Sequence, residues 1–177
     1  ILNRAGDDLR IDWGHLYVAA GGTGVSQVTS SDRDARDTFF ASGKLPTKDD
    51  TRMPRPASDA WPVIATSIDL GRVGRAPVSR HLMLGYDQVY AIELMKTKLK
   101  PYWSRNGLDM KGLLKESEKN YASHTKRCSD FDKKLTADLT RIGGKPYAEL
   151  CTLSYRQCLA ANVVAAGTHG EPLQFPK

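Results

Sequence analysis

The chain has 177 residues, of which 40% are hydrophobic and 26% are charged, an ordinary composition for a globular protein in water. No apolar run reaches the roughly 18 residues that a membrane-spanning helix needs, and the charged start of the chain does not predict a secretory leader. The net charge of +6 does not predict nucleic-acid binding, because bases and acids are interleaved instead of forming one patch. Lys and Arg outnumber Asp and Glu by 15 to 12 in residues 1–107 and by 11 to 8 in residues 108–177.

The first half of the chain is typical of short strands separated by turns. Residues 11–20 predict a strand that ends in a glycine-rich loop, and residues 26–60 are polar and rich in turn formers. Residues 61–70 predict a second strand, because β-branched side chains nearly alternate along it. Residues 78–94 predict either one long strand or a hairpin with a weak turn near Asp87. Short strands with turns between them favour antiparallel β-structure.

Gly22 and Gly24 follow the first predicted strand, as glycines do in a dinucleotide-binding loop. Gln27 stands where that motif has its third glycine, and we expect no packed helix over residues 31–37. We therefore expect no dinucleotide site, and no other feature of the sequence predicts a cofactor.

The second half of the chain predicts a helical hairpin. Apolar side chains recur at steps of 3, 4 and 7 through residues 108–142, with Lys, Glu and Asp on the opposite face. The glycines at residues 143–144 predict the end of this helix. Pro146 suits the first turn of a second helix, which we predict over residues 147–166. Residues 167–177 then predict a loop leading onward.

Both halves have the character of parts of larger domains. The second predicted helix is apolar around much of its circumference, and three or four strands are too few to close a β-sandwich. The chain also begins with Ile1 instead of Met. We therefore expect a segment of a longer protein, with one core on each side of a boundary near Gly107.

The three cysteines predict neither a metal site nor a disulfide within the second helix. No Cys-x-x-Cys pair is present. Cys151 and Cys158 are separated by roughly 10 Å along a helix axis, which is too far for a disulfide. Cys128 could pair with either of them only if two helices pack closely. The default expectation is three buried free thiols.

A series of motifs, in order and spacing, resembles the glutaminase A-like family over nearly the whole chain. The motifs toward the end of the first half are Leu45-Pro-Thr-Lys-Asp-Asp50, Pro54-Arg-Pro56, Trp61-Pro-Val63, Asp69-Leu-Gly71, Arg80-His81, Tyr86-Asp87 and Pro101-Tyr-Trp103. In the second half the resemblance continues through residues 147–161 and the terminal Phe175-Pro-Lys177.

This resemblance implies an α+β chain that crosses a domain boundary. Residues 1–107 would be the C-terminal part of a β-sandwich-like N-terminal domain, and residues 108–177 would be the first helices of an (α/α) toroid. It also implies a secreted or periplasmic parent protein that hydrolyses L-glutamine to L-glutamate and ammonia. Because most of the toroid lies outside these residues, we expect the chain alone to be inactive.

The resemblance names no catalytic residue within the chain, but two residues are candidates for lining a site. Lys177 ends the Phe175-Pro-Lys177 motif, which is generally followed by an acidic residue in the family. Arg156 lies on the second predicted helix and, if it faced inward, would need a carboxylate partner. The expected partners are glutamine or a related amide and the remainder of the parent chain.

Two other functions fit the same architecture. A carbohydrate-active hydrolase often combines a β-sandwich with a helical toroid, and would need two carboxylates spaced for acid–base work. A non-catalytic binding or packing module is the second alternative.

Overall fold

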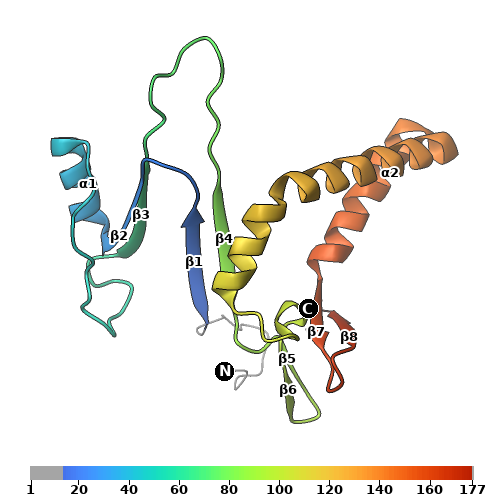
Figure 1. The fold of residues 1–177 in the computed structure, drawn as a ribbon. Coiled ribbons are helices and arrows are strands. Elements are labelled where there is room, and N and C mark those ends of the chain that lie inside the picture. Colours follow the sequence, from blue (N-terminus) through green and yellow to red (C-terminus); the bar gives the residue numbers. More distant parts are fainter. Residues whose placement is uncertain (1–13, 177) are drawn as a thin grey trace. The chain divides into compact units, whose positions relative to one another are not determined.

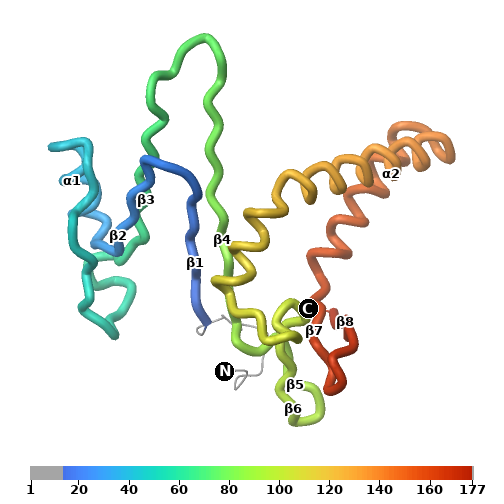
Figure 2. The backbone as a smooth tube through the Cα atoms, viewed as in Figure 1, coloured from blue at the N-terminus to red at the C-terminus, as the bar shows by residue number. Residues whose placement is uncertain are grey.

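The computed structural model describes residues 14–176, which divide into two compact units. One unit is formed by residues 18–84, and the other by residues 14–17 together with 85–176 (Figures 1 and 2). The described elements, in chain order, are β1 (His15–Ala20), β2 (Val25–Ser31), α1 (Asp32–Ser42), β3 (Pro62–Ile68), β4 (Leu82–Asp87), β5 (Ile92–Leu94), β6 (Thr97–Leu99), the 3-10 helix η1 (Tyr102–Ser104), α2 (Met110–Ala160), β7 (Asn162–Ala166) and β8 (Pro172–Pro176).

The strands form four two-stranded sheets, which pair β1 with β4, β2 with β3, β5 with β6 and β7 with β8. The last three of these pairs are antiparallel. Together with the long helix α2, they confirm the predicted mixture of α-helix and antiparallel β-structure.

Helix α1 begins directly where β2 ends, because Ser31 serves as the last strand residue and as the helix cap. The Ser31 hydroxyl oxygen accepts a hydrogen bond from the Asp34 backbone N–H at 3.1 Å. At the other end Gly43 takes a left-handed φ of 68°, and its N–H donates to the Phe39 carbonyl at 2.7 Å.

The expectation that residues 31–37 lack a packed helix was wrong. Helix α1 contacts both β2 and β3, and Ala35 of the helix and Val28 of β2 are both buried. The helix was missed because its first turns are polar, so its apolar face has few residues to reveal a period. The predicted strand over residues 61–70 is confirmed as β3, which pairs with β2 from Val25↔Ile68 to Ser31↔Pro62.

The break predicted near Asp87 is present, but it does not make a hairpin of residues 78–94. The Asp87 carboxylate accepts a hydrogen bond from the Val89 N–H at 2.8 Å, and Val89 has a φ of 67°, so the chain turns there. Strand β5 then pairs with β6 around Met95 and Lys96, whose φ values are 46° and 67°. Asn and Gly usually occupy such a turn, and because neither is present here, the sequence contains no turn signal.

Helix α2 consists of two arms joined at a kink. Asp109 caps its start by accepting a hydrogen bond from the Gly112 N–H at 2.7 Å. At Gly144 the backbone leaves the helical region, with φ 77° and ψ −179°, and Pro146 follows. We name residues 110–143 the first arm and residues 145–160 the second arm. The predicted helical break is confirmed, and Figure 2 shows the change of direction there.

The second arm ends at Ala160, so the prediction that the helix continues to residue 166 was wrong. Residues 162–166 form β7, where Val163 and Val164 suit an extended backbone better than a helix. The segment predicted as a loop, residues 167–177, contains β8, which completes a hairpin with β7.

The β7–β8 hairpin returns to the segment that precedes α2. Pro101 forms a β-bridge with Ala165, and the Ala166 N–H donates to the Lys100 carbonyl at 2.9 Å. Helix η1 also contacts β7. Ala165 is completely buried at this junction, so the two ends of the helical hairpin are fixed close to each other.

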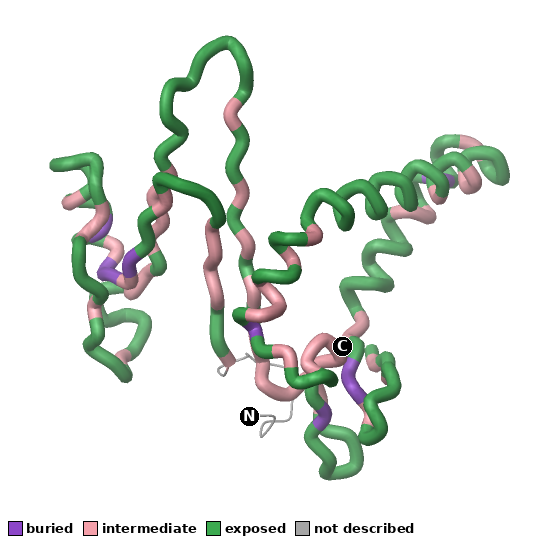
Figure 3. Tube along the Cα trace, viewed as in Figure 1, coloured by how far each residue is buried: buried purple, intermediate pink, exposed green. Residues whose placement is uncertain are grey.

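Little of the described chain is buried, as the extent of green in Figure 3 shows. The buried apolar residues are mostly small and comprise Val28, Ala35, Leu99, Met110, Ala148, Ala165 and Ala166. Many large apolar side chains are exposed, including Leu150, Leu153 and Leu159 of the second arm at 64%, 55% and 56%. The second arm therefore has large apolar side chains on more than one side that the described residues leave more than half exposed.

Candidate functional site

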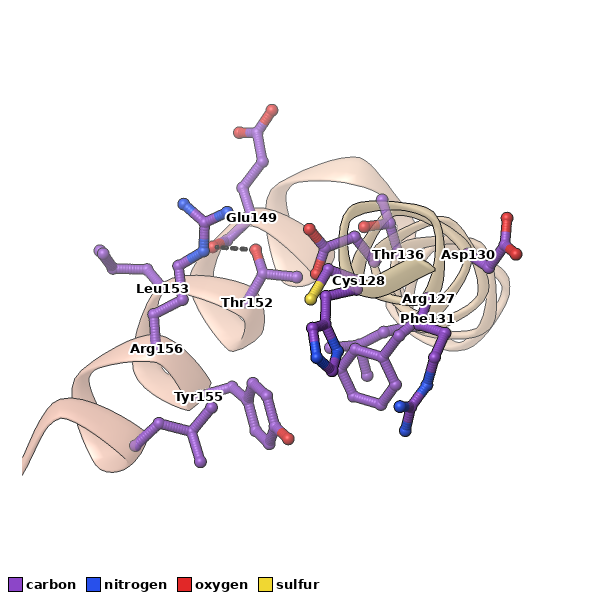
Figure 4. Close-up of a pocket in the computed structure, with 14 residues that line it drawn as sticks. Arg127, Cys128, Asp130, Phe131, Thr136, Glu149, Thr152, Leu153, Tyr155 and Arg156 are labelled. Carbon is purple, nitrogen blue, oxygen red and sulfur yellow. Dashed lines mark hydrogen bonds between the residues drawn. The ribbon is translucent and has the colours of Figure 1, made fainter. Parts of the chain in front are cut away.

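A groove of about 1250 Å³ lies between the two arms of α2 and is the main candidate site (Figure 4). Both arms contribute a mixture of apolar, aromatic and ionisable side chains. The lining residues are His124, Arg127, Cys128, Asp130, Phe131, Asp132, Leu135 and Thr136 from the first arm, and Glu149, Thr152, Leu153, Tyr155, Arg156 and Leu159 from the second.

Helical periodicity places these side chains in the groove. Cys128, Phe131 and Leu135 follow one another at steps of 3 and 4, so they share one face of the first arm. The kink at Gly144 turns the second arm back, and the Phe131 and Tyr155 rings meet with centroids 5.8 Å apart and planes at 35°. This aromatic contact joins the two walls of the groove.

Arg156, predicted as a site residue, does line the groove, but its side chain does not cross it. Figure 4 shows Tyr155 pointing toward Phe131, whereas Arg156 runs along its own arm past Leu153 toward Glu149. Among the described residues Arg156 has no ion-pair partner, since the Glu149 carboxylate lies 3.8 Å from the Lys145 amine instead. The substrate-binding role of Arg156 stays a prediction.

Lys177, the other predicted site residue, lies outside the described residues. The described residues just before it, Pro172–Pro176, form strand β8. The role of Lys177 likewise stays a prediction.

The expectation of buried thiols was wrong. Cys128 and Cys158 are exposed and Cys151 is half-buried, because the helical faces that carry them lack covering elements. All three are free, in agreement with the absence of a disulfide between Cys151 and Cys158. The Cys151 thiol, one turn from Tyr147, raises the pKa of that phenol above its usual value.

The groove contains the residue types of hydrolytic chemistry but not an assembled catalytic pair. Within the described hydrogen bonds, none joins His124, Cys128 or Tyr155 to a carboxylate. A general base or an activated nucleophile needs such a partner within about 2.6–3.2 Å. The described residues also hold no group of three or more His, Cys, Asp or Glu side chains suited to a metal ion.

A second polar cluster, in residues 18–84, was not anticipated from the sequence. The Arg52 guanidinium binds both oxygens of Asp50, at 2.9 Å and 2.7 Å, and Arg55 Nη1 lies 2.8 Å from Asp50 Oδ2. The side chains of Asp50 and Arg55 are 15% and 5% exposed. Hydrogen bonds from Arg52 hold the pKa of the Asp50 carboxyl well below its usual range.

This cluster fixes the loop after α1 to strand β2. The Asp50 N–H donates to the Thr29 carbonyl at 2.7 Å, and the Asp49 carboxylate accepts from the Thr29 N–H at 2.8 Å. Two motifs that carry the family resemblance, residues 45–50 and 54–56, supply Asp49, Asp50 and Arg55, and Arg52 lies between them. Their spacing could have suggested an ion pair, because two acidic residues are followed within six positions by two arginines, the second of them between two prolines.

Across residues 14–176, no helix combines the length and apolar character needed to cross a lipid bilayer.

Comparison with known proteins agrees with the family resemblance. A family model described as "Domain of unknown function (DUF5127)" matches residues 2–138. Glutaminase A from Aspergillus oryzae (strain ATCC 42149 / RIB 40) is 30% identical over 172 residues, which cover 94% of this chain and 24% of that protein. The chain therefore spans about a quarter of the length of this relative. No solved structure matches the chain.

The family model covers well over half of the 177 residues, and the similarity to Glutaminase A extends over nearly all of them. The predicted glutaminase A-like resemblance is confirmed: the chain belongs to the family described as Domain of unknown function (DUF5127).

Proposed function

We propose that the chain is part of a glutaminase A-like amidohydrolase. The full-length protein would add one water to the side-chain amide of L-glutamine and release L-glutamate and ammonia. The observation that supports this function is the 30% identity to Glutaminase A over 94% of the chain. Because the chain spans 24% of that relative, the activity would belong to the whole protein.

The architecture that fits this function places a domain boundary near Gly107. Residues 1–107 would end a β-sandwich-like domain, and residues 108–177 would begin an (α/α) toroid. The arms of α2 support this proposal, since they form a helical hairpin whose second arm leaves Leu150, Leu153 and Leu159 more than half exposed. Further helices of a toroid would bury these side chains.

The chain would then contribute part of the wall around the active site, while the reacting groups come from elsewhere in the protein. Arg156 would bind a carboxylate of the substrate, because a guanidinium pairs with a carboxylate through two parallel hydrogen bonds. Lys177 would line the same site. A secreted or periplasmic location, implied by the family resemblance, completes the proposal.

The decisive experiment measures ammonia release by the full-length polypeptide that contains these residues. L-glutamine, L-asparagine and a panel of oligosaccharides are assayed in parallel. Ammonia from L-glutamine is the expected result. Reducing sugar without ammonia would instead identify a carbohydrate-active hydrolase, and no product with any substrate would contradict both enzymes.

The role of this chain within the enzyme is tested by substitution. Arg156→Gln is expected to raise the KM for L-glutamine, whereas Arg141→Gln, on an exposed part of the first arm outside the groove, leaves it unchanged. The purified 177-residue chain is expected to release no ammonia. If isothermal titration of that chain with glycans gave binding heats, the non-catalytic binding module would be the better description.

A further inference from the structure

The connection between β3 and β4 contains the longest unbroken run of exposed residues outside helices and strands in the described chain. We name residues 69–81 the β3–β4 loop; it lies at the top of Figure 1, in green. Residues 69–77 are all exposed, and Val78 is the first half-buried residue of the loop. It spans 13 residues between Ile68, which ends β3, and Leu82, which begins β4.

Hydrogen bonds hold the start of this loop, and near its end Arg80 Nη1 donates to the Ser79 carbonyl at 2.9 Å. The Asp69 N–H donates to the Gly24 carbonyl at 2.8 Å, and the Asp69 carboxylate accepts from the Gly71 N–H at 2.7 Å. Among the described hydrogen bonds, none reaches residues 72–78. A segment with exposed backbone and few bonds opens at little cost in free energy.

The loop is also rich in arginine. Arg72, Arg75 and Arg80 occur within it, and no acidic residue follows Asp69 before β4 begins. No ion pair among the described residues engages any of the three guanidinium groups. The Arg72 and Arg75 side chains are therefore available to a pocket that selects a positively charged residue, whereas Arg80 Nη1 donates to the Ser79 carbonyl.

We infer that the Arg75–Ala76 peptide bond is a cleavage site for arginine-specific serine proteases. Such a protease binds its substrate as an extended strand, so several residues on each side of the bond must be locally released. Arg75 is the central residue of the 13-residue loop, with six loop residues on each side. The bond after it therefore has the most room to enter a protease cleft.

The other two arginines of the loop are less favourable. Arg72 directly follows Gly71, whose N–H is bound to the Asp69 carboxylate, so little of the loop before it is free to be released. Arg80 is followed by the half-buried His81, one residue before β4 begins. Cleavage at Arg80 would need part of the β1–β4 pair to open.

Several basic residues elsewhere in the described chain are held in hydrogen-bonded structure. Lys48 lies in the loop that Asp49 and Asp50 fix to β2. Arg127 and Arg141 lie on the first arm of α2, where cleavage would need several helical turns to unwind. Lys96 occupies the two-residue turn between β5 and β6.

Cleavage would add one water across the bond, leaving a carboxylate on Arg75 and an amine on Ala76. The products within this chain would be residues 1–75 and 76–177. The paired strands β2 and β3 stay on the first product, while β5, β6, α2, β7 and β8 stay on the second. Of the four sheets, the cut separates only the partners β1 and β4 into different products.

The test is limited digestion of the full-length polypeptide with trypsin, followed over time by mass spectrometry of the new chain ends. Considering cuts within residues 14–176, the first new ends are expected at Arg75 and Ala76. Arg75→Gln is expected to abolish those ends, whereas the matched control Arg127→Gln leaves them unchanged.

Two results would overturn the inference. One is an intact β3–β4 loop at times when bonds in α2 or near Lys48 are already cut. The other is a first cut within the loop at Arg72 or Arg80 in the wild-type protein. The ammonia assay of the same samples before digestion keeps this result separate from the proposed glutaminase function.

Discussion

Arg55 Nη1 lies 2.8 Å from Asp50 Oδ2, and the Arg55 side chain is 95% buried, with 5% of its surface exposed. Its Nε and Nη2 atoms have no hydrogen-bond partner among the described residues. The charge of this guanidinium is therefore balanced mainly by Asp50. A buried cation that loses its counter-charge is strongly destabilising.

Asp50→Asn removes that counter-charge while keeping the size of the side chain. The loop after α1 is expected to loosen from β2, because the buried Arg55 guanidinium loses its counter-charge beside the backbone hydrogen bond from Asp50 to Thr29. Amide hydrogen exchange of β2 should accelerate by at least about tenfold. Asp138→Asn, in an exposed pair with Lys134, is the matched control and should leave exchange in β2 unchanged.

The same pair predicts a dependence of stability on acid pH. Hydrogen bonds from Arg52 lower the pKa of the Asp50 carboxyl in the folded state. The resulting stabilisation is complete above the unfolded pKa of about 4 and is lost as the pH falls through the folded pKa. Amide exchange of β2, corrected for its intrinsic pH dependence, should therefore show progressive loss of protection below about pH 4. Equal acid sensitivity in Asp50→Asn would contradict this assignment.

Gly144→Ala is expected to disturb the kink of α2. With φ 77° and ψ −179°, Gly144 occupies a backbone region that is nearly closed to residues with a Cβ. The expected cost is about 1–3 kcal/mol, measured as a loss of unfolding free energy in urea. Gly74→Ala is the control, because Gly74 has no positive φ and open space around it. A neutral Gly144→Ala variant would show that the kink does not require glycine.

The contact between Phe131 and Tyr155 is expected to couple the two arms. A double-mutant cycle with Phe131→Ala and Tyr155→Ala should give a coupling energy of about 0.5–1 kcal/mol, in the lower part of the range for aromatic pairs. The low value follows from exposures of 49% and 41%. Additive single-variant effects would show that the arms are held together by other contacts.

Ser31→Ala is expected to weaken α1. The Ser31 hydroxyl is buried and caps the helix at Asp34 N–H, so its loss should cost about 1 kcal/mol. Ser42→Ala removes an exposed hydroxyl from the last turn and should cost less than about 0.5 kcal/mol. Urea denaturation of both variants provides the comparison. Equal effects would mean that the cap adds nothing beyond a surface hydroxyl.

Sequence patterns predicted the elements that carry strong local signals. Strand β3 has β-branched residues at alternating positions, and Gly144 with Pro146 marks the kink of α2. Each of these signals acts within a few residues, so it survives without knowledge of the rest of the fold. The family resemblance depends instead on the order of many weak motifs along the chain, and the comparison with known proteins confirmed it.

The errors arose where tertiary pairing decided the structure. Residues 162–166 continue a helical pattern, yet the pairing of Val163 with Phe175 in β8 makes them a strand. The turn at Met95 and Lys96 has ordinary helix-forming side chains in left-handed conformations. The groove between the arms, and the path of Arg156 within it, depend on the geometry of the kink and could not be read from one helix alone.

The bridge between Pro101 and Ala165 gives the helical hairpin the topology of an inserted module. The chain leaves one small junction, travels along both arms of α2, and returns to the same junction. The entropic cost of bringing the two ends of such a segment together grows only slowly with its length. Residues can therefore be added at the tip around Gly144 without displacing β7. In evolutionary terms, the helices could lengthen or shorten by whole turns while the base that anchors them stays fixed.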